Sequence, residues 1–294
     1  MKTLIIGASG LVGGYLYREF TPLGDIKGTA FPKGCKDHLI LDIRDKGALT
    51  RLFSEYRPGL VLCPAAITNV EYCQAHPAET REVNVEGVRN VIREVKSNGA
   101  KFVFFSSEYI FDGQGGPYAE EDTPQPLNEY GRQKLEVENI IQKELSDYII
   151  CRTTVVYGWE AEGKNFVLQM LKNLEGRIPM KVPSDQLSSP TYAQDLARSV
   201  RALVEQGLRG IFNLVGSEVM DRYTFAGVIC SVFDLNAKLI SPVATSELGQ
   251  KALRPLKAGL KIDKAIKIPG VVLSSAQEGL RKMKEGKDAY FNFK

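Results

Sequence analysis

The sequence has little of the material from which several common functional sites are built. Only two of its 294 residues are histidines, His38 and His76, so a histidine-based metal site or a Ser-His-Asp triad has almost nothing to draw on. The cysteines number five, an odd count, and no two of them form a C-x-x-C pair. We therefore expect neither a disulfide framework nor a zinc site, and no metal ligands are predicted.

Long apolar runs and an excess of one charge are also missing. The opening "MKTLIIGASG" has only a few apolar residues before its glycines, too few for a signal peptide or a membrane span. The formal net charge is +3, and no basic run indicates a nucleic-acid partner. Since 44% of the residues are hydrophobic and 25% charged, the composition is that of an ordinary globular protein. We expect a soluble cytoplasmic protein with no membrane partner.

In the first half of the chain, short apolar runs alternate with longer amphipathic ones. Strands are predicted at 2–7, 25–31, 38–43, 59–66, 101–107 and 147–154. Helices are predicted at 11–20, 46–56, 78–99 and around Tyr130. The strands are apolar throughout, which is typical of a parallel sheet covered on both faces. The pattern predicts an α/β fold with a Rossmann-like, doubly wound parallel sheet.

The pattern loosens after residue 155. Helices are predicted at 164–176, 190–207 and 221–235, and a strand at 210–216. We interpret residues 1–154 as a dinucleotide-binding domain to which 190–215 returns. Residues 155–189 and 216–294 are then a smaller C-terminal substrate-binding lobe.

A loop is predicted at 112–126, "DGQGGPYAEEDTPQP", because it contains three glycines and three prolines. It connects the fifth strand to the helix around Tyr130. A loop of this length inside a compact domain is usually functional or mobile.

The segment "GASGLVG" places Gly7, Gly10 and Gly13 directly after the first strand and at the start of a helix. Glycines there permit a tight turn and let a pyrophosphate approach the free amides of the helix N-terminus. Such a motif is weak by itself, but here it has the strand before it and the helix after it that the site requires. The alternative is a tight turn that holds no ligand.

Two later features agree with a nucleotide site. Asp42 ends the third predicted strand, where its carboxylate could accept a hydrogen bond from an adenine amino group. Ala65 and Ala66 follow the fourth strand and are small enough for a cofactor to lie across the strand ends. Either feature could instead be structural, since an aspartate after a strand is often a helix cap.

The end of the second strand bears on the choice between NADH and NADPH. An acidic residue there binds the ribose 2′-hydroxyl and repels a 2′-phosphate. This chain has Ala30 and Phe31 at that place, with Lys33 close by. The arrangement favours NADPH, with NADH possible, unless Lys33 is only a solvated loop cation.

In "PLNEYGRQKLE", Tyr130 and Lys134 lie one helical turn apart. A lysine ammonium there would bring the tyrosine pKa from about 10 toward working pH, and it could bind the nicotinamide ribose. The preceding strand ends in Ser106 and Ser107, and a hydroxyl there could polarise a carbonyl. The alternative is an ordinary solvent-facing turn of helix.

These residues resemble a known family. "SSEYIFDGQGGPYAEEDTPQPLNEYGRQKLEVE" resembles the active-site segment of dTDP-4-dehydrorhamnose reductases, which are extended short-chain dehydrogenase/reductases. "CPAAITNVEYCQAHPAETREVNVEGV" resembles their segment after the fourth strand. Three further segments resemble parts of their C-terminal substrate lobe: "GKNFVLQML", "SDQLSSPTYAQDLA" and "RPLKAGL". The family uses a nicotinamide cofactor to reduce a 4-keto group on a deoxysugar attached to dTDP.

The resemblance implies roles for individual residues. The catalytic residues would be Ser107, Tyr130 and Lys134. The cofactor contacts would be Gly10, Leu11, Val12, Asp42, Ile43, Ala65, Ala66 and Ile67, beside Gly7, Gly13, Lys33, Tyr130 and Lys134 from the motifs above. The substrate contacts would be Ser107, Glu108 and Val155. Three positions depart from the family pattern: Ser107 replaces a threonine, Glu108 an aspartate, and Val155 a frequent tryptophan. The resemblance therefore does not determine which sugar is bound.

The sequence thus predicts an NAD(P)H-dependent oxidoreductase of dTDP-rhamnose biosynthesis that acts on a nucleotide sugar. A homodimer is possible. The alternative is an NADP-binding regulatory subunit resembling the methionine adenosyltransferase beta subunit, because that relative keeps much of the active-site pattern. A third alternative is a structural component of an oligomer without turnover.

Overall fold

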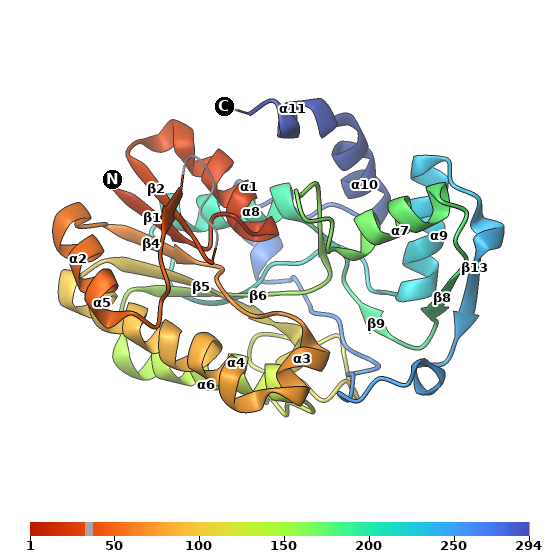
Figure 1. Cartoon of the computed structure of the whole chain (residues 1–294), viewed down its shortest axis with the longest axis horizontal. Helices are drawn as coiled ribbons and strands as arrows, with labels where there is room; N and C mark the ends of the chain where they lie inside the picture. Colours follow the sequence, from red (N-terminus) through yellow and green to blue (C-terminus); the bar gives the residue numbers. More distant parts are fainter. Residues whose placement is uncertain (33–37, 294) are drawn as a thin grey trace.

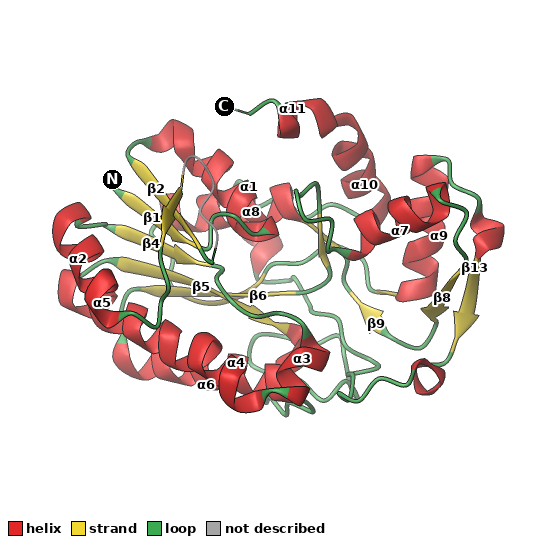
Figure 2. Cartoon of the chain, in the orientation of Figure 1, coloured by secondary structure: helices red, strands yellow, loops and turns green. Residues whose placement is uncertain are grey.

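A seven-stranded parallel sheet forms the centre of the computed structural model, which describes residues 1–32 and 38–293 (Figures 1 and 2). The strand order is β11-β6-β5-β4-β1-β2-β3, and every neighbouring pair is parallel. The strands are β1 (Thr3–Ile6), β2 (Ile26–Ala30), β3 (His38–Ile40), β4 (Leu60–Cys63), β5 (Lys101–Ser107), β6 (Tyr148–Thr153) and β11 (Gly210–Asn213). The predicted Rossmann-like α/β fold is confirmed. The order reverses beside β1, and ligands of such sheets bind at that switch point.

Helices cover both faces of this sheet, as the continuous apolar strands require. The first face carries α1 (Leu11–Phe20) and α8 (Ala193–Glu205). The second carries α2 (Lys46–Tyr56), α5 (Val88–Asn98) and α6 (Glu129–Glu144). Successive residues of β1 alternate between the two cores: Ile5 packs on the first, and Leu4 and Ile6 on the second. All three side chains are almost fully buried, so these positions of β1 require apolar residues on both sides of the sheet.

The predicted helix 78–99 is not one regular helix. It consists of α4 (Pro77–Arg81), a π-helical stretch η2 (Glu82–Gly87) and α5, and it is preceded by the unpredicted α3 (Val70–Ala75). A π turn widens the helix by one residue and often occurs at functional sites.

The C-terminal part adds elements beyond the end of the sheet, on the right of Figure 1. They are α7 (Phe166–Glu175), α9 (Arg222–Phe233) and the parallel pair β8 (Met180–Pro183) and β13 (Ile240–Val243). Short strands also pair as β7 (Val156–Tyr157) with β10 (Thr191–Tyr192), and β9 (Leu187–Ser188) with β12 (Met220–Asp221). The chain ends in α10 (Ala276–Glu285) and α11 (Lys287–Phe291), and the Arg18 guanidinium of α1 lies 3.7 Å from the centre of the Tyr290 ring.

The predicted loop 112–126 is present, but its first half is tied to the C-terminal part. Gly116 N–H donates to Lys257 O at 3.0 Å, and Tyr118 N–H to Gly259 O at 3.0 Å. The Tyr118 ring also stacks on Phe111 with 4.2 Å between ring centres. Glu120 is held as well, because its carbonyl accepts from Arg152 Nη1 at 2.8 Å. The expectation of a mobile loop is therefore narrowed to the residues after Glu120. Among the described residues, none of the helices has the length and apolar character needed to span a bilayer.

Candidate active site

The glycine turn leaves the N-terminus of α1 open for an anion. Gly7 has φ +93°, in the region that favours glycine, and a Cβ on Gly13 would lie 2.0 Å from Gly7 O. Gly10 is the N-cap of α1 and offers no side-chain cap, whereas α2 and α6 are capped by Asp45 and Asn128. The first amides of α1, those of the predicted contacts Leu11 and Val12, thus suit a pyrophosphate. Gly10 is exposed, and both contacts are half-buried.

Asp42 lies just beyond β3, next to the end of β2, because Leu41 N–H donates to Ala30 O at 3.0 Å. Its carboxylate is held by Arg44, with Nε 3.0 Å from Oδ1 and Nη2 2.7 Å from Oδ2. These hydrogen bonds lower the pKa of Asp42 below its usual value. The helix-cap alternative does not apply to α2, since its cap is Asp45. Ile43 is buried, and the predicted contact Lys33 lies outside the described residues.

The segment 65–67 follows β4, and two hydrogen bonds between the Ile67 backbone and the Asn84 side chain hold it in place. Ile67 N–H donates to Asn84 Oδ1 at 2.7 Å, and Asn84 Nδ2 donates to Ile67 O at 3.0 Å. Asn84 lies in the π-helical η2 and also donates to Gln133 Oε1 of α6 at 2.9 Å. It therefore connects the predicted contacts Ala65, Ala66 and Ile67 to the helix that carries Tyr130. Sequence analysis missed Asn84 and Gln133.

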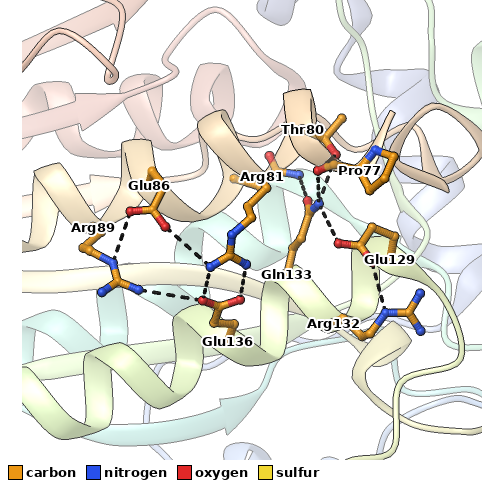
Figure 3. Close-up of polar contacts among 10 residues, drawn as sticks. Pro77, Thr80, Arg81, Glu86, Arg89, Glu129, Arg132, Gln133 and Glu136 are labelled. Carbon is orange, nitrogen blue, oxygen red and sulfur yellow. Dashed lines mark hydrogen bonds and ion pairs between the residues drawn. The ribbon is translucent and has the colours of Figure 1, made fainter. Parts of the chain in front are cut away.

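Gln133 joins α6 to α4 (Figure 3). Its Nε2 lies 3.0 Å from Thr80 Oγ1 and 3.2 Å from Glu129 Oε1. Figure 3 also shows that Arg81 of α4 and Arg89 of α5 pair with Glu86 of η2 and Glu136 of α6. The only signal available in the sequence is a polar residue at a core-facing helix position. Buried amides of this kind rigidify a site when every partner is satisfied.

The proposed catalytic residues Ser107, Tyr130 and Lys134 come together at the end of β5. All three are largely buried, and the Ser107 hydroxyl lies close enough to the Tyr130 phenol to lower its pKa. Lys134 Nζ donates to Phe105 O at 2.8 Å and lies 5.7 Å from the centre of the Tyr130 ring. α6 passes so close to β5 that a Cβ on Gly131 would lie 2.0 Å from Tyr109 O. Only glycine allows this approach.

The titration of this group differs from the expectation. Burial raises the pKa of Tyr130, and the nearby Ser107 hydroxyl opposes this rise only in part. Tyr130 is therefore protonated at neutral pH, which is the form that donates a proton. Burial also lowers the pKa of Lys134 to about 8. The expected lowering of the Tyr130 pKa by Lys134 is not found: burial is the largest influence on this pKa, and it raises it.

Glu108 follows Ser107 and is 3% exposed. Its Oε1 accepts from Thr154 Oγ1, and its Oε2 accepts from Gly259 N–H at 2.9 Å. Burial raises the pKa of Glu108 to about 7, although both hydrogen bonds lower it. Glu108 thus joins the end of β5 to the C-terminal part.

Val155 comes directly after Thr154 and has φ +41°. A β-branched residue in the left-handed region is a strained outlier that costs about 1 to 3 kcal/mol, and such strain gathers at active sites. Nearby, Thr153 is the register partner of Ser107, and its buried Oγ1 has no hydrogen-bond partner among the described residues. A buried hydroxyl without a partner suits a polar ligand group. The described residues contain no group of three or more His, Cys, Asp or Glu arranged to hold a metal.

A family model described as the RmlD substrate binding domain matches residues 1–287. The chain belongs to this family. The RmlD family is the one that the motifs predicted, since dTDP-4-dehydrorhamnose reductases are among the relatives of the chain. The predicted family is therefore confirmed.

Three relatives of this RmlD-family chain extend over most of its length. It is 33% identical to the spore coat polysaccharide biosynthesis protein SpsK of Bacillus subtilis (95% of each chain). It is 30% identical to a dTDP-4-dehydrorhamnose reductase of Sinorhizobium fredii (98% of this chain and 100% of the relative). It is 28% identical to the methionine adenosyltransferase 2 subunit beta of Danio rerio (88% and 82%).

Among solved structures, the dTDP-4-dehydrorhamnose reductase of Bacillus anthracis in complex with NADP is similar to this RmlD-family chain. The TM-score is 0.89 at 29% identity, over 97% of this chain and 98% of the other. The likeness therefore covers the C-terminal part as well as the sheet.

Proposed function

We propose that the protein is an NADPH-dependent reductase of a nucleotide-activated 4-keto-deoxysugar, most similar in its chemistry to dTDP-4-dehydrorhamnose reductase. The reductase relatives make it an NAD(P)H-dependent oxidoreductase. The observation that carries the finer proposal is the meeting of Ser107, Tyr130 and Lys134 at the end of β5. The open N-terminus of α1 supports a dinucleotide beside them.

In the proposed reaction, bound NADPH supplies a hydride to C4 of the sugar. The Ser107 hydroxyl donates a hydrogen bond to the ketone oxygen. Tyr130 gives its proton to that oxygen as the C4–O group becomes an alkoxide, so that an alcohol forms and a tyrosinate remains. The Lys134 ammonium stabilises this tyrosinate and binds the ribose, and a proton from solvent restores Tyr130.

The division of labour along the chain is part of the proposal. Residues 1–154 and 190–215 bind the cofactor; the return of α8 and β11 to the sheet supports this assignment. Residues 155–189 and 216–294 bind the sugar nucleotide, together with Ser107, Glu108 and Val155. We place the enzyme in the cytoplasm and in dTDP-rhamnose biosynthesis. A homodimer stays a prediction, which sedimentation would test.

A second candidate is an NADP-binding regulatory subunit, and the similarity to the methionine adenosyltransferase 2 subunit beta favours it. A regulator has no need of a protonated, buried Tyr130 beside Ser107. Cofactor binding alone also gives no reason to keep the strained backbone at Val155.

The experiment is NADPH oxidation with a panel of dTDP- and UDP-linked 4-keto-6-deoxysugars, with product counted against cofactor. We expect one alcohol formed for each NADPH consumed with a dTDP sugar. The same preparation is tested for a protein partner by pull-down. No turnover with any sugar, together with tight binding of an enzyme whose kinetics change, would replace the reductase by the regulator.

A further inference from the structure

The sequence argument for NADPH depends on Lys33, but the described residues place another cation at the end of β2. Strands β2 and β3 are in register, with Ala30 opposite Ile40. The chain after β3 therefore runs beside the end of β2. There the Arg44 guanidinium lies 5.9 Å from the centre of the Phe31 ring.

Arg44 is held along one edge of its guanidinium only. Nε and Nη2 bind the Asp42 carboxylate, and the backbone N–H of Arg44 also donates to Asp42 Oδ1 at 2.9 Å. Nη1 makes no hydrogen bond to any of the described residues, and 44% of the side chain is exposed. One carboxylate thus fixes the orientation of the Arg44 guanidinium, and Nη1 remains available to donate hydrogen bonds to a ligand.

The chemistry of this place suits a phosphate. A carboxylate at the end of β2 would bind a ribose 2′-hydroxyl, but Ala30 is there instead and is buried. The neighbouring carboxylate of Asp42 is paired with Arg44, so it does not present an uncompensated negative charge. A guanidinium with a free nitrogen binds a phosphate through charge-assisted hydrogen bonds.

We propose that Arg44 binds the 2′-phosphate of NADPH and that Asp42 holds the guanidinium in place for it. This inference rests on the proposed function, because it assumes that the adenosine of the cofactor lies across β2 and β3. It assigns the cofactor preference to a residue that follows the third strand rather than the second.

Two acidic residues weaken the attraction of the Arg44 charge for a 2′-phosphate. Glu79 and Glu82, from α4 and η2, act electrostatically on its guanidinium. Glu79 also accepts from the Tyr72 hydroxyl at 2.8 Å. Glu82→Gln should therefore raise the affinity for a 2′-phosphate by a few-fold, since it removes a charge that opposes the dianion.

The experiment is calorimetric titration of the full chain with adenosine 2′,5′-bisphosphate and with 5′-AMP, which lacks the 2′-phosphate. We expect Arg44→Ala to weaken binding of the bisphosphate by about tenfold or more. Binding of 5′-AMP should change by at most a few-fold. The bisphosphate affinity of Arg44→Lys should lie between those of the unmutated protein and Arg44→Ala, because lysine keeps the charge but not the planar set of guanidinium donors. Arg51→Ala removes an exposed cation of α2 and is the matched control, with no change expected.

The other outcomes overturn the inference in distinct ways. An equal loss for both ligands would mean that Arg44 contacts the adenine or the 5′-phosphate. A loss only in Lys33→Ala would assign the 2′-phosphate to Lys33. Tighter binding of 5′-AMP by the unmutated protein would reject a 2′-phosphate site and leave an NADH-dependent reductase standing. Binding of neither ligand would reject the cofactor site of the proposed function itself.

Discussion

The Glu108 carboxylate accepts a hydrogen bond from the backbone amide of Gly259 at 2.9 Å, across 151 residues of sequence. A buried acid thus connects the end of β5 to the C-terminal part of the chain. Its other oxygen binds the hydroxyl of Thr154, the residue before the strained Val155. The backbone at Thr154 and at Gly259 is therefore held by one buried side chain.

Glu108→Gln should remove a pH dependence of stability. Burial raises the pKa of Glu108 from 4.5 to about 7, so the folded state binds a proton that the unfolded chain releases in this window. Stability then falls as pH rises from about 4.5 to 7, by up to roughly 3 kcal/mol. The glutamine can still accept from Gly259 and donate to Thr154. Urea unfolding at pH 5 to 8 should give a flatter curve and a more stable variant above pH 7. Parallel curves for the two proteins would contradict this account.

Lys134→Met should stabilise the protein and inactivate it. Burial lowers the pKa of Lys134 from 10.5 to about 8, so the cost of charging it is fully present below pH 8 and disappears as pH rises to 10.5. Removal of the ammonium should raise the free energy of unfolding at pH 7 by roughly 2 kcal/mol, after loss of the hydrogen bond to Phe105. This gain should shrink at pH 10. Turnover by the unmutated enzyme should fall above pH 8. A less stable variant at pH 7 would refute the burial cost.

Tyr130→Phe should lower kcat by about 10²- to 10⁴-fold and leave the affinity for NADPH nearly unchanged. The ring still fills its buried place, and only the phenol hydroxyl near Ser107 is lost. Stopped-flow oxidation and fluorescence titration of the cofactor measure the two effects separately. Comparable turnover by the variant would remove Tyr130 from the mechanism.

At position 155, glycine should be more stable than alanine. The φ of +41° is strained for any side chain with a Cβ, and both substitutions remove the isopropyl group of Val155. We expect Val155→Gly to exceed Val155→Ala by about 1 kcal/mol in free energy of unfolding. Val156 is the control, because its backbone lies in β7 and the order there should reverse. The same order at both positions would show that Val155 is not strained.

Hydrogen exchange should divide the loop 112–126 into two parts even without ligand. The amides of Gly116 and Tyr118 donate to backbone carbonyls and should exchange slowly. The amides of Thr123 and Gln125 lack such bonds to the described residues and should exchange fast, then slow when a dTDP sugar binds. Uniformly fast exchange over the whole loop would mean that the anchor opens in solution.

Local patterns predicted much of the sheet and of the glycine turn. The apolar strands had to be buried on both faces, and Gly7 and Gly13 stand where the backbone has no room for a Cβ. The pair β8 and β13 was missed, because four-residue strands far apart in sequence have no local signature. The third strand ends at Ile40 rather than at Ile43, since the chain turns where Asp42 binds Arg44.

The sequence predicted the individual residues of the candidate site. It did not predict the residues that hold them in place. Ser107, Tyr130 and Lys134 follow a recognisable order along the chain. Asn84 and Gln133 function only through partners that the fold brings together, so no spacing reveals them. The pKa of Tyr130 likewise depends on burial, which is a property of the packed structure.

The place of β11 at the end of the sheet has a consequence for synthesis of the chain on the ribosome. Its neighbour β6 ends at Thr153, whereas β11 begins at Gly210, so nearly 60 further residues must be made before β6 gains its outer partner. At about 5 to 20 residues per second, translation leaves the edge of β6 without this strand for roughly 3 to 12 s. A nascent edge of this kind can pair with another chain. Slow codons between β6 and β11 should therefore lower the yield of native enzyme more than the same codons placed after Asn213.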